Sequence, residues 1–428
     1  MKKDKFMAEN NNLIFHGCDV AELVKEYGAP LYIMSEDEIR ERCREIKREF
    51  TEKYPDTRAA FAGKACQTLD VCRIVASEGM GLDVVSGGEI YAALKAGYDP
   101  ALLEFNGNAK SRAEIEYALE AGVGTIIIDN MSELEIIAET AAKKGIKAVV
   151  ALRVTPGVDS HTHQFISTGQ LDSKFGFAPE EIFDHAVKAV LDSEHLDLIG
   201  LHYHVGSQLH ENDSHIMATD VMLELLADLK EKYGYVPREL NCGGGFGVHY
   251  AGDPERATVS YFMDPVMERI NAFYEKSGDK RPVVAIEPGR WVVAEAGITV
   301  YEVTSVKTNA AGRTYYGIDG GYPDDPRVAL YDAKYEAEAV TKVNEPHDHK
   351  VTIAGKCCES GDVLIWDIML PEMKPGDLLA VYATGAYNYT MANNYNRQPR
   401  PAMLMIKDGV PRLSVRRETY EDLIAREI

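Results

Sequence analysis

The chain has 428 residues, and its 68 acidic side chains outnumber the 46 Lys and Arg side chains, which gives a formal net charge of −22. Hydrophobic residues make up 45% of the chain, enough to form a core, so a wholly disordered protein is excluded. The acidic balance argues against nucleic acid or an anionic membrane as the main partner, because binding phosphate groups requires a surplus of Lys and Arg.

Neither the apolar segments nor the cysteines indicate export. No stretch reaches the roughly 18 apolar residues of a membrane span, and the basic start MKKDKFMAENNN has no apolar segment behind it. The seven cysteines form no tight framework and no CxxC pair, which is typical of reduced thiols. We therefore expect a cytoplasmic protein without a membrane partner.

Short β-branched segments alternate with segments of helical periodicity from about residue 36 to 290. Eight strands are predicted, at 58–63, 81–86, 102–106, 124–129, 147–154, 196–205, 239–244 and 282–288. Between them lie predicted helices, several of which begin at Ser, Asp or Pro and end at Gly, such as 87–97, 111–122, 131–145, 179–192 and 214–234. Eight such units predict an α/β protein with a closed (β/α)8 TIM-like barrel. An open doubly wound sheet is the alternative, but GKAC rather than a GxGxxG loop follows the first strand.

The chain after about residue 290 has a different pattern. Its β-branched and aromatic segments are separated by Gly, Pro and Asp with little helical periodicity; they include 297–308, 313–319, 335–340, 349–355 and 377–385. The strand-like segment PLYIMS at 30–35 is expected to join them. The predicted domains are therefore an N-terminal segment 1–35, a barrel 36–285 and a β-rich C-terminal domain 286–428 that the N-terminal segment joins.

Active sites of such barrels lie at the carboxyl ends of the strands. Side chains and glycines suited to chemistry gather at these predicted ends: Lys64, Asp83, Ser86, Asn106, Arg153, His202, His204, Ser207, Gly243, Gly244, Gly245, Glu287 and Arg290. A lysine at such an end, when shielded from solvent, has a lowered pKa and can form a Schiff base with an aldehyde. Alternatively, Lys64 is a solvated residue that ends a strand.

The segment LNCGGGFG at 240–247 places three glycines directly after a strand, where backbone N–H groups can approach a phosphate. The alternative is a tight turn. Ser207 offers a hydroxyl to the same anion. In EPGR at 287–290, Glu287 could hold a protonated ring nitrogen and Arg290 a phosphate or carboxylate, unless the segment is only a charged turn.

His202 and His204 alternate on one strand and are expected to point to the same face. Further HxH pairs occur at 161–163 and 347–349. A zinc site is disfavoured because no Cys or carboxylate stands at ligand spacing, and we expect no metal. The two imidazoles could instead stack on an aromatic cofactor or have a structural role.

At this point the chain resembles the alanine-racemase-fold, pyridoxal-phosphate-dependent decarboxylases. The resemblance runs from about residue 30 to 405 and rests on motifs in the family's order: FAGKAC, SKFGF, GLHYHVGSQ, LNCGGGFG, EPGR, AGKCCESGD and GAYNYTMANNYNRQPRPA. Within the family, the motifs are most similar to those of members that decarboxylate meso-2,6-diaminopimelate to L-lysine, the last step of lysine biosynthesis. Pyridoxal 5'-phosphate is the implied cofactor.

The resemblance also implies roles for individual residues. Lys64 matches the Schiff-base lysine and Cys358 the catalytic thiol. Cofactor contacts are implied for Lys64, Asp83, His204, Ser207, Gly244, Gly245, Glu287, Gly289, Arg290 and Tyr387. Substrate contacts are implied for Arg290, Arg327, Tyr331, Glu359 and Tyr387. In the family the CES segment comes from the second subunit, which implies a homodimer with shared active sites. By its composition alone, the pair Cys357–Cys358 could instead be buried and apolar.

Four functions are considered for a chain with these motifs. The first is decarboxylation of meso-diaminopimelate, and the second is decarboxylation of another basic amino acid or a carboxylated polyamine on the same scaffold. Arg327 and Glu359 discriminate between them, because a substrate without a distal carboxylate has no use for the arginine. A cofactor-homeostasis protein would be a barrel alone, and racemisation would need a second base, for which a thiol is poorly suited.

Overall fold

The computed structural model describes residues 6–158 and 173–428. The chain divides into two compact units. The β unit comprises Met1–Glu41, Val248–Glu255 and Val292–Ile428, and the barrel unit comprises Arg42–Gly247 and Arg256–Trp291. Within the described ranges, no helix is long and apolar enough to cross a membrane.

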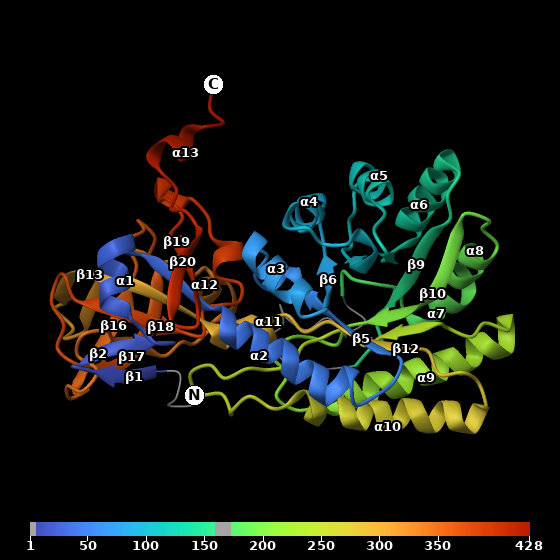
Figure 1. The fold of residues 1–428 in the computed structure, drawn as a ribbon, viewed down its shortest axis with the longest axis horizontal. Coiled ribbons are helices and arrows are strands. Elements are labelled where there is room, and N and C mark those ends of the chain that lie inside the picture. Colours follow the sequence, from blue (N-terminus) through green and yellow to red (C-terminus); the bar gives the residue numbers. More distant parts are fainter. Residues whose placement is uncertain (1–5, 159–172) are drawn as a thin grey trace. The chain divides into compact units, whose positions relative to one another are not determined.

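Eight parallel strands of the barrel unit close into a barrel, as predicted (Figure 1). Their bounds are β5 (Thr57–Ala62), β6 (Gly81–Val84), β7 (Leu103–Phe105), β8 (Thr125–Ile128), β9 (Ala148–Val154), β10 (Leu196–Tyr203), β11 (Glu239–Asn241) and β12 (Val283–Ile286). Each predicted strand is confirmed at its predicted place. The barrel closes where β12 pairs with β5, with Val284 opposite Thr57.

Helices follow the strands of the barrel. They are α3 (Leu69–Ser77), α4 (Gly87–Ala96), α5 (Arg112–Ala121), α6 (Met131–Lys144), α7 (Pro179–Glu181), α8 (Val187–Leu191), α9 (Asp213–Tyr233) and α10 (Val259–Ser277). The capping prediction is confirmed at α5, where Ser111 and Glu114 form a capping box and Gly122 ends the helix with φ +77°. All four residues of β8 are buried, as expected for a parallel strand that is covered on both faces.

The β unit is built around a nine-stranded sheet. Seven of its strands follow the path β17-β16-β14-β13-β4-β19-β20, and β18 pairs with β13 and with β15. The bounds are β4 (Leu31–Ser35), β13 (Gly297–Thr308), β14 (Thr314–Ile318), β15 (Ala337–Ala339), β16 (His349–Ala354), β17 (Val363–Leu370), β18 (Leu378–Tyr382), β19 (Ala402–Lys407) and β20 (Val410–Val415). A small sheet consists of β1 (Phe6–Glu9), β2 (Asn12–Phe15) and β3 (Cys18–Asp19), and the helices are α1 (Val20–Tyr27), α12 (Arg327–Tyr331) and α13 (Tyr420–Ile424). Helices α2 (Glu36–Ile46) and α11 (Arg290–Val293) cross the boundaries between the units.

The expectation that the N-terminal segment joins the β-rich region is confirmed. Strand β4 lies between β13, to which it is antiparallel, and β19, to which it is parallel. All five β4 residues are buried, so this early segment forms part of the core of a sheet whose other strands come from the C-terminal third. Strands β17, β19 and β20 lie outside the segments that were predicted from the sequence.

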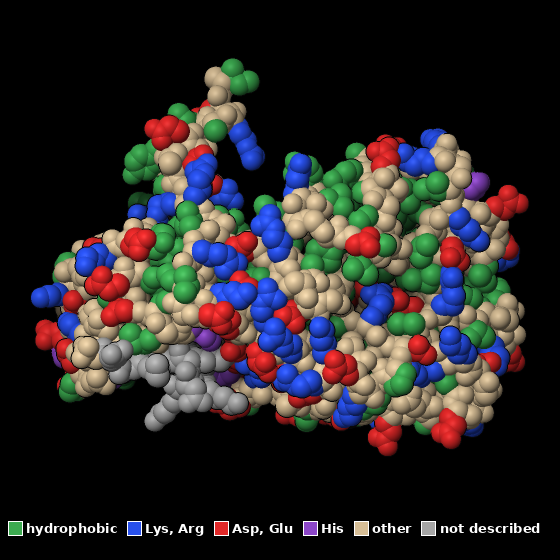
Figure 2. All heavy atoms as spheres, viewed as in Figure 1, with side chains coloured by type: hydrophobic (Ala, Val, Ile, Leu, Met, Phe, Trp, Pro, Cys, Tyr) green, Lys and Arg blue, Asp and Glu red, His purple; other side chains and the backbone are tan. Residues whose placement is uncertain are grey.

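The surface carries both signs of charge. On the face drawn in Figure 2, basic and acidic side chains are interspersed with uncharged ones.

Candidate active site at the carboxyl ends of the barrel strands

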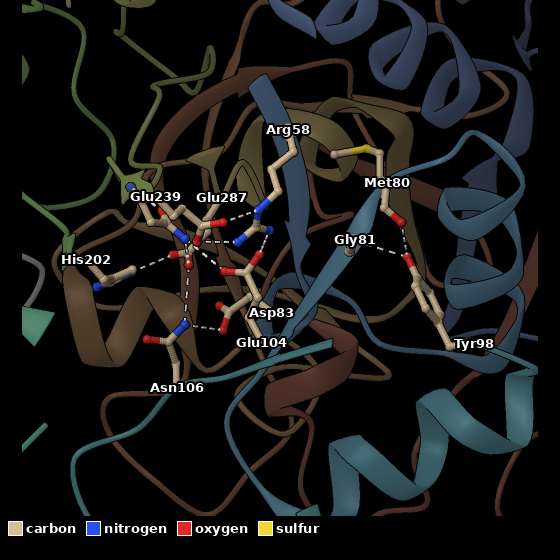
Figure 3. A network of polar contacts seen from close by, with 12 residues as sticks. Arg58, Met80, Gly81, Asp83, Tyr98, Glu104, Asn106, His202, Glu239 and Glu287 are labelled. Atoms are coloured by element: carbon tan, nitrogen blue, oxygen red, sulfur yellow. Dashed lines mark hydrogen bonds and ion pairs between the residues drawn. The ribbon is translucent and has the colours of Figure 1, made fainter. Parts of the chain in front are cut away.

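The carboxylate of Glu287, which follows β12, is the centre of a buried polar network (Figure 3). Its Oε1 accepts hydrogen bonds from Nδ2 of Asn241 (2.9 Å) and of Asn106 (3.3 Å). Its Oε2 lies 3.0 Å from Nε2 of His202. Burial and the nearby Arg153 lower the pKa of His202 to about 3, so this imidazole is neutral and donates from Nε2. Three neutral N–H donors therefore hold the Glu287 carboxylate.

Two further carboxyl groups lie in the same network. Asp83, in β6, accepts a hydrogen bond from Asn106 Nδ2 (2.7 Å), and burial and repulsion by Glu287 raise its pKa to about 6. Glu104, in β7, accepts one from Asn241 Nδ2 (2.8 Å), and burial raises its pKa against the opposing charge of Arg58. A site crowded with buried acids favours a cationic or proton-sharing ligand.

The triple glycine after β11 is packed against the ends of the neighbouring strands. A Cβ on Gly244 would overlap the Glu287 carbonyl, and one on Gly245, whose φ is +99°, would overlap the Gly206 carbonyl. The Gly244 carbonyl accepts a hydrogen bond from Nε2 of buried His215 (3.0 Å). These positions require glycine, so the turn that the sequence suggested is present, in a form that brings backbone groups to the strand ends.

The predicted anion-binding groups meet beside this turn. Arg290 Nη2 donates to Ser207 Oγ (3.0 Å), which joins the EPGR segment to the loop after β10. Gly289 packs against Ala62 and Ala65, on either side of Lys64, where a Cβ would lie only 2.8 Å from the Ala62 Cβ. A hydroxyl, a guanidinium and glycine backbone thus gather at one end of the barrel, which is the donor set that a phosphate requires.

His204 follows β10 and accepts a hydrogen bond at Nδ1 from the Gly244 backbone N–H (3.3 Å). Burial and the cationic side chains of Lys64 and Arg153 lower its pKa, so the ring is neutral. A neutral ring tied at one edge suits stacking on a flat cofactor better than it suits binding an anion. Of the HxH pairs, 161–163 lies outside the described residues. Within the described part of the chain, no group of three or more His, Cys, Asp or Glu side chains is arranged to hold a metal.

Lys64 differs from the expectation of a lysine shielded from solvent. It lies in a single 3-10 turn, Gly63–Ala65, directly after β5, and its side chain is exposed. Its position at the strand end is as predicted. Its two neighbours in the turn, Gly63 and Ala65, are buried.

Four of the substrate residues suggested by the resemblance lie in the β unit, and Arg290 lies in the barrel unit. Arg327 begins α12, is 6% exposed, and donates from Nη1 to the hydroxyls of Tyr250 (3.1 Å) and Tyr335 (2.6 Å). Tyr331 ends the same short helix and is half-buried. The four-residue spacing therefore places both residues on one helix, one turn apart.

The adjacent cysteines occupy different environments. Cys357 Sγ accepts a hydrogen bond from Gln398 Nε2 (3.1 Å), and burial raises the pKa of this thiol to about 12. Cys358 is exposed, its backbone N–H bound to Asn396 Oδ1 (2.8 Å), and Glu359 is exposed beside it. The apolar interpretation thus suits Cys357 better than Cys358, which is accessible for chemistry.

Tyr387 has φ +62°, a left-handed conformation that is rare for a bulky residue and costs of order 1–3 kcal/mol. Strain of this kind is often kept at ligand sites. The side chain is half-buried.

Several residues of the barrel network were missed by sequence reasoning. Asn241 and Glu104 lie within segments read only as strands, and Arg58, which pairs with Glu104 and Glu239, was not singled out. Glu89 accepts a hydrogen bond from the Val85 N–H (2.7 Å); burial raises its pKa to about 7, and Lys64 opposes that shift. A charged or amide side chain inside an otherwise apolar strand is the signal that could have identified the first three.

Comparison with known proteins gives a consistent result. A family model described as pyridoxal-dependent decarboxylase, pyridoxal binding domain, matches residues 34–294. Diaminopimelate decarboxylase of Bacillus subtilis is 43% identical, and the match covers 98% of this chain and 96% of that protein. The crystal structure of diaminopimelate decarboxylase from M. jannaschii in complex with L-lysine is 36% identical, with a TM-score of 0.92 over 100% of this chain and 98% of that one. Lysine/ornithine decarboxylase from Vibrio vulnificus, complexed with cadaverine, shares the fold at 24% identity and a TM-score of 0.78, covering 91% and 97%.

Proposed function

Since the chain belongs to the pyridoxal-dependent decarboxylases, we propose that it removes one carboxyl group from meso-2,6-diaminopimelate to give L-lysine and CO2. It is a carboxy-lyase of lysine biosynthesis and uses pyridoxal 5'-phosphate. The observation that carries this proposal is the full-length similarity to diaminopimelate decarboxylases, 43% over 98% of the chain for the Bacillus subtilis protein.

The residues at the carboxyl ends of the strands fit this cofactor. Lys64 supplies the primary amine for covalent attachment, and His204 offers a neutral ring face. Ser207, Arg290 and the backbone of Gly244, Gly245 and Gly289 supply donors for the phosphate. Asp83 and Tyr387 complete the proposed contacts. When bound, the cofactor supplies an electron sink for the pair of electrons released by decarboxylation.

Glu287 has a defined electrostatic role in this proposal. Its carboxylate is buried and held by the N–H groups of His202, Asn106 and Asn241. All three hydrogen-bond partners are neutral donors, so they hold the carboxylate without neutralising its charge. The carboxylate can then hold a proton on the cofactor's ring nitrogen.

The substrate has an amino acid group at each end, and the residues of the β unit suit the end that does not react. Arg327 and Tyr331 bind the distal carboxylate, Glu359 accepts the distal ammonium, and Arg290 and Tyr387 also contact substrate. A guanidinium and a carboxylate are the complementary charges for one amino acid group.

Cys358 is the proposed acid. As CO2 leaves the substrate, the bonding electrons stay behind, and a proton from the Cys358 Sγ–H completes the new C–H bond. The exposed position of Cys358 supports this role. We propose a homodimer in which Cys358 and Glu359 of one chain complete the site of the other, in the cytoplasm, with neither nucleic acid nor membrane as a partner.

The function is tested by incubating the purified protein, loaded with pyridoxal 5'-phosphate, with meso-diaminopimelate, lysine and ornithine, and measuring CO2 and product. We expect rapid conversion of diaminopimelate to L-lysine and little reaction with the monocarboxylates. Equal rates on lysine or ornithine would instead favour a decarboxylase of other basic amino acids.

The attachment site is tested by borohydride reduction and peptide mapping. The adduct is expected on Lys64, with loss of the visible absorbance in Lys64→Ala. An adduct on another lysine would overturn the assignment.

The shared site is tested by mixing two inactive variants, Lys64→Ala and Cys358→Ala. In a mixed dimer one site has both groups intact, so activity should return to about a quarter of wild type if chains pair at random and only heterodimers are active at one of their two sites. If heterodimers form without activity, the site is not shared.

A further inference from the structure

The guanidinium of Arg327 is enclosed by two tyrosines of the β unit. Its carbon lies 4.9 Å from the ring centre of Tyr250 and 5.7 Å from that of Tyr335. The rings are perpendicular, with their centres 5.7 Å apart. Both tyrosines are buried, at 7% and 3% exposure. The cation is thus packed against aromatic surface as well as hydrogen-bonded.

The hydrogen bonds of this group have a defined direction. The Tyr335 hydroxyl accepts from Arg327 Nη1 (2.6 Å) and donates to Asp325 Oδ1 (3.3 Å). The same Asp325 oxygen accepts from the backbone N–H of Arg327 (3.3 Å). Asp325 therefore fixes both the backbone of Arg327 and the hydroxyl that holds its side chain.

The five N–H donors of the Arg327 guanidinium divide into those that the tyrosines accept and those that a ligand can accept. A guanidinium has five N–H donors, and the two on Nη1 are directed at the hydroxyls of Tyr250 and Tyr335. The Nε–Nη2 edge, which carries the other three, is the edge that binds a carboxylate through two parallel hydrogen bonds. Among the described residues, no acidic side chain forms an ion pair with this guanidinium. Because the two tyrosine hydroxyls are neutral acceptors, they orient the guanidinium without neutralising its charge.

We propose that Tyr250 and Tyr335 are positioning residues for substrate specificity, which hold Arg327 Nη1 so that its Nε–Nη2 edge receives the distal carboxylate of the substrate. The proposal rests on the proposed function, in which Arg327 binds that carboxylate. It adds residues that come from two separate segments, 77 and 8 positions away from Arg327 in the chain.

The test uses two inhibitors that differ by one carboxylate. L-Lysine keeps the distal carboxylate of diaminopimelate, and cadaverine (1,5-diaminopentane) lacks it. The ratio of the inhibition constant of cadaverine to that of L-lysine, measured against diaminopimelate decarboxylation by the holoenzyme, reports how well the carboxylate is bound.

In Tyr335→Phe and in Tyr250→Phe this ratio should fall about 5- to 20-fold, since an oriented hydrogen bond to a charged group is lost. The KM for diaminopimelate should rise while kcat changes less than about 2-fold, because the distal end does not react.

The matched control is Tyr316→Phe. Tyr316 is buried in the same unit, and its hydroxyl contacts the Pro371 carbonyl (3.4 Å) and the Met373 N–H (3.1 Å), so the same atom is removed away from Arg327. It should leave the ratio unchanged. Cofactor absorbance and melting temperature of each variant show that it is folded and loaded.

A double-mutant cycle separates positioning from a merely structural role. In an Arg327→Ala background, Tyr335→Phe should have no further effect on the ratio, because the tyrosine acts only through the arginine. An unchanged ratio in both single Phe variants, or an equal fall with and without Arg327, would overturn the proposal. Failure of wild type to decarboxylate diaminopimelate would instead overturn the proposed function, and an unchanged ratio in Arg327→Ala alone would overturn the role assigned to Arg327.

Discussion

Each of the two units holds a buried charge on neutral partners, and the two charges have opposite sign. In the barrel unit, the N–H groups of His202, Asn106 and Asn241 surround the Glu287 carboxylate. In the β unit, the hydroxyls of Tyr250 and Tyr335 hold the Arg327 guanidinium. The difference in sign matches the two ends of the proposed chemistry, a protonated ring nitrogen in the barrel and a carboxylate at Arg327.

A half-buried charge in the barrel unit shows the contrast. Arg58 in the barrel unit is paired with both Glu104 and Glu239. An ion pair cancels the charge that it buries, whereas neutral donors or acceptors only stabilise it. In the proposed function the charges of Glu287 and Arg327 serve a ligand, whereas the charge of Arg58 is paired within the protein.

The largest effect is expected at Glu287. Glu287→Gln keeps the shape and one acceptor oxygen but removes the charge, so kcat should fall about 100- to 1000-fold, comparable to the loss of a preorganised electrostatic partner. The KM for diaminopimelate should change little. Steady-state kinetics and the cofactor absorbance spectrum measure both. A variant with nearly wild-type kcat would mean that the carboxylate has only a structural role.

At Arg327 the loss should appear in binding. Arg327→Ala leaves the distal carboxylate without its partner, at a cost of about 2–4 kcal/mol, or roughly 30- to 1000-fold in kcat/KM for diaminopimelate. The preference over D-lysine should largely disappear, while cofactor binding is retained. Arg313→Ala is the control, because this arginine of the same unit pairs with Asp367 at the surface. An intact preference would show that the specificity resides elsewhere.

At Arg58 we expect a loss of stability without a change in chemistry. Arg58→Met leaves Glu104 buried without a cation and should lower the free energy of unfolding by about 3 kcal/mol. Urea denaturation measures this loss, and kcat per folded enzyme should remain near wild type. Adding Glu104→Gln to the variant should restore part of the stability, since no unpaired charge remains. A large fall in kcat with normal stability would place Arg58 among the functional charges instead.

The smallest effect concerns pH. Burial lowers the pKa of His215 from 6.5 to about 4. Below pH 6.5 the unfolded chain therefore binds a proton that the folded chain does not, and stability is lost as pH falls from 6.5 towards 4, by about 2 kcal/mol at pH 5. His215→Gln offers an amide N–H to the Gly244 carbonyl but cannot become charged, so its unfolding free energy should fall less between pH 8 and pH 5. Parallel pH dependences for the two proteins would contradict this.

The barrel site could be predicted in large part from the sequence. Parallel strands bring their carboxyl ends to one edge, so Asp83, Asn106, His202 and Glu287 were placed together by their positions at the carboxyl ends of four strands. The contacts between side chains inside the barrel could not be predicted in the same way. Which inward side chain of β7 meets which of β11 depends on the stagger of the closed barrel, and so the contact of Glu104 with Asn241 was missed.

The amino-acid sequence by itself determined the order and type of the barrel's elements, because hydrophobic periodicity, helix caps and strand-breaking glycines act over a few residues. It also determined which strand ends carry Lys64 and Glu287. Only the tertiary structure decided that Lys64 is exposed and that Tyr250 meets Arg327. A side chain's exposure and its distant partners depend on how loops pack, and a contact across 77 positions leaves no periodic trace in either segment.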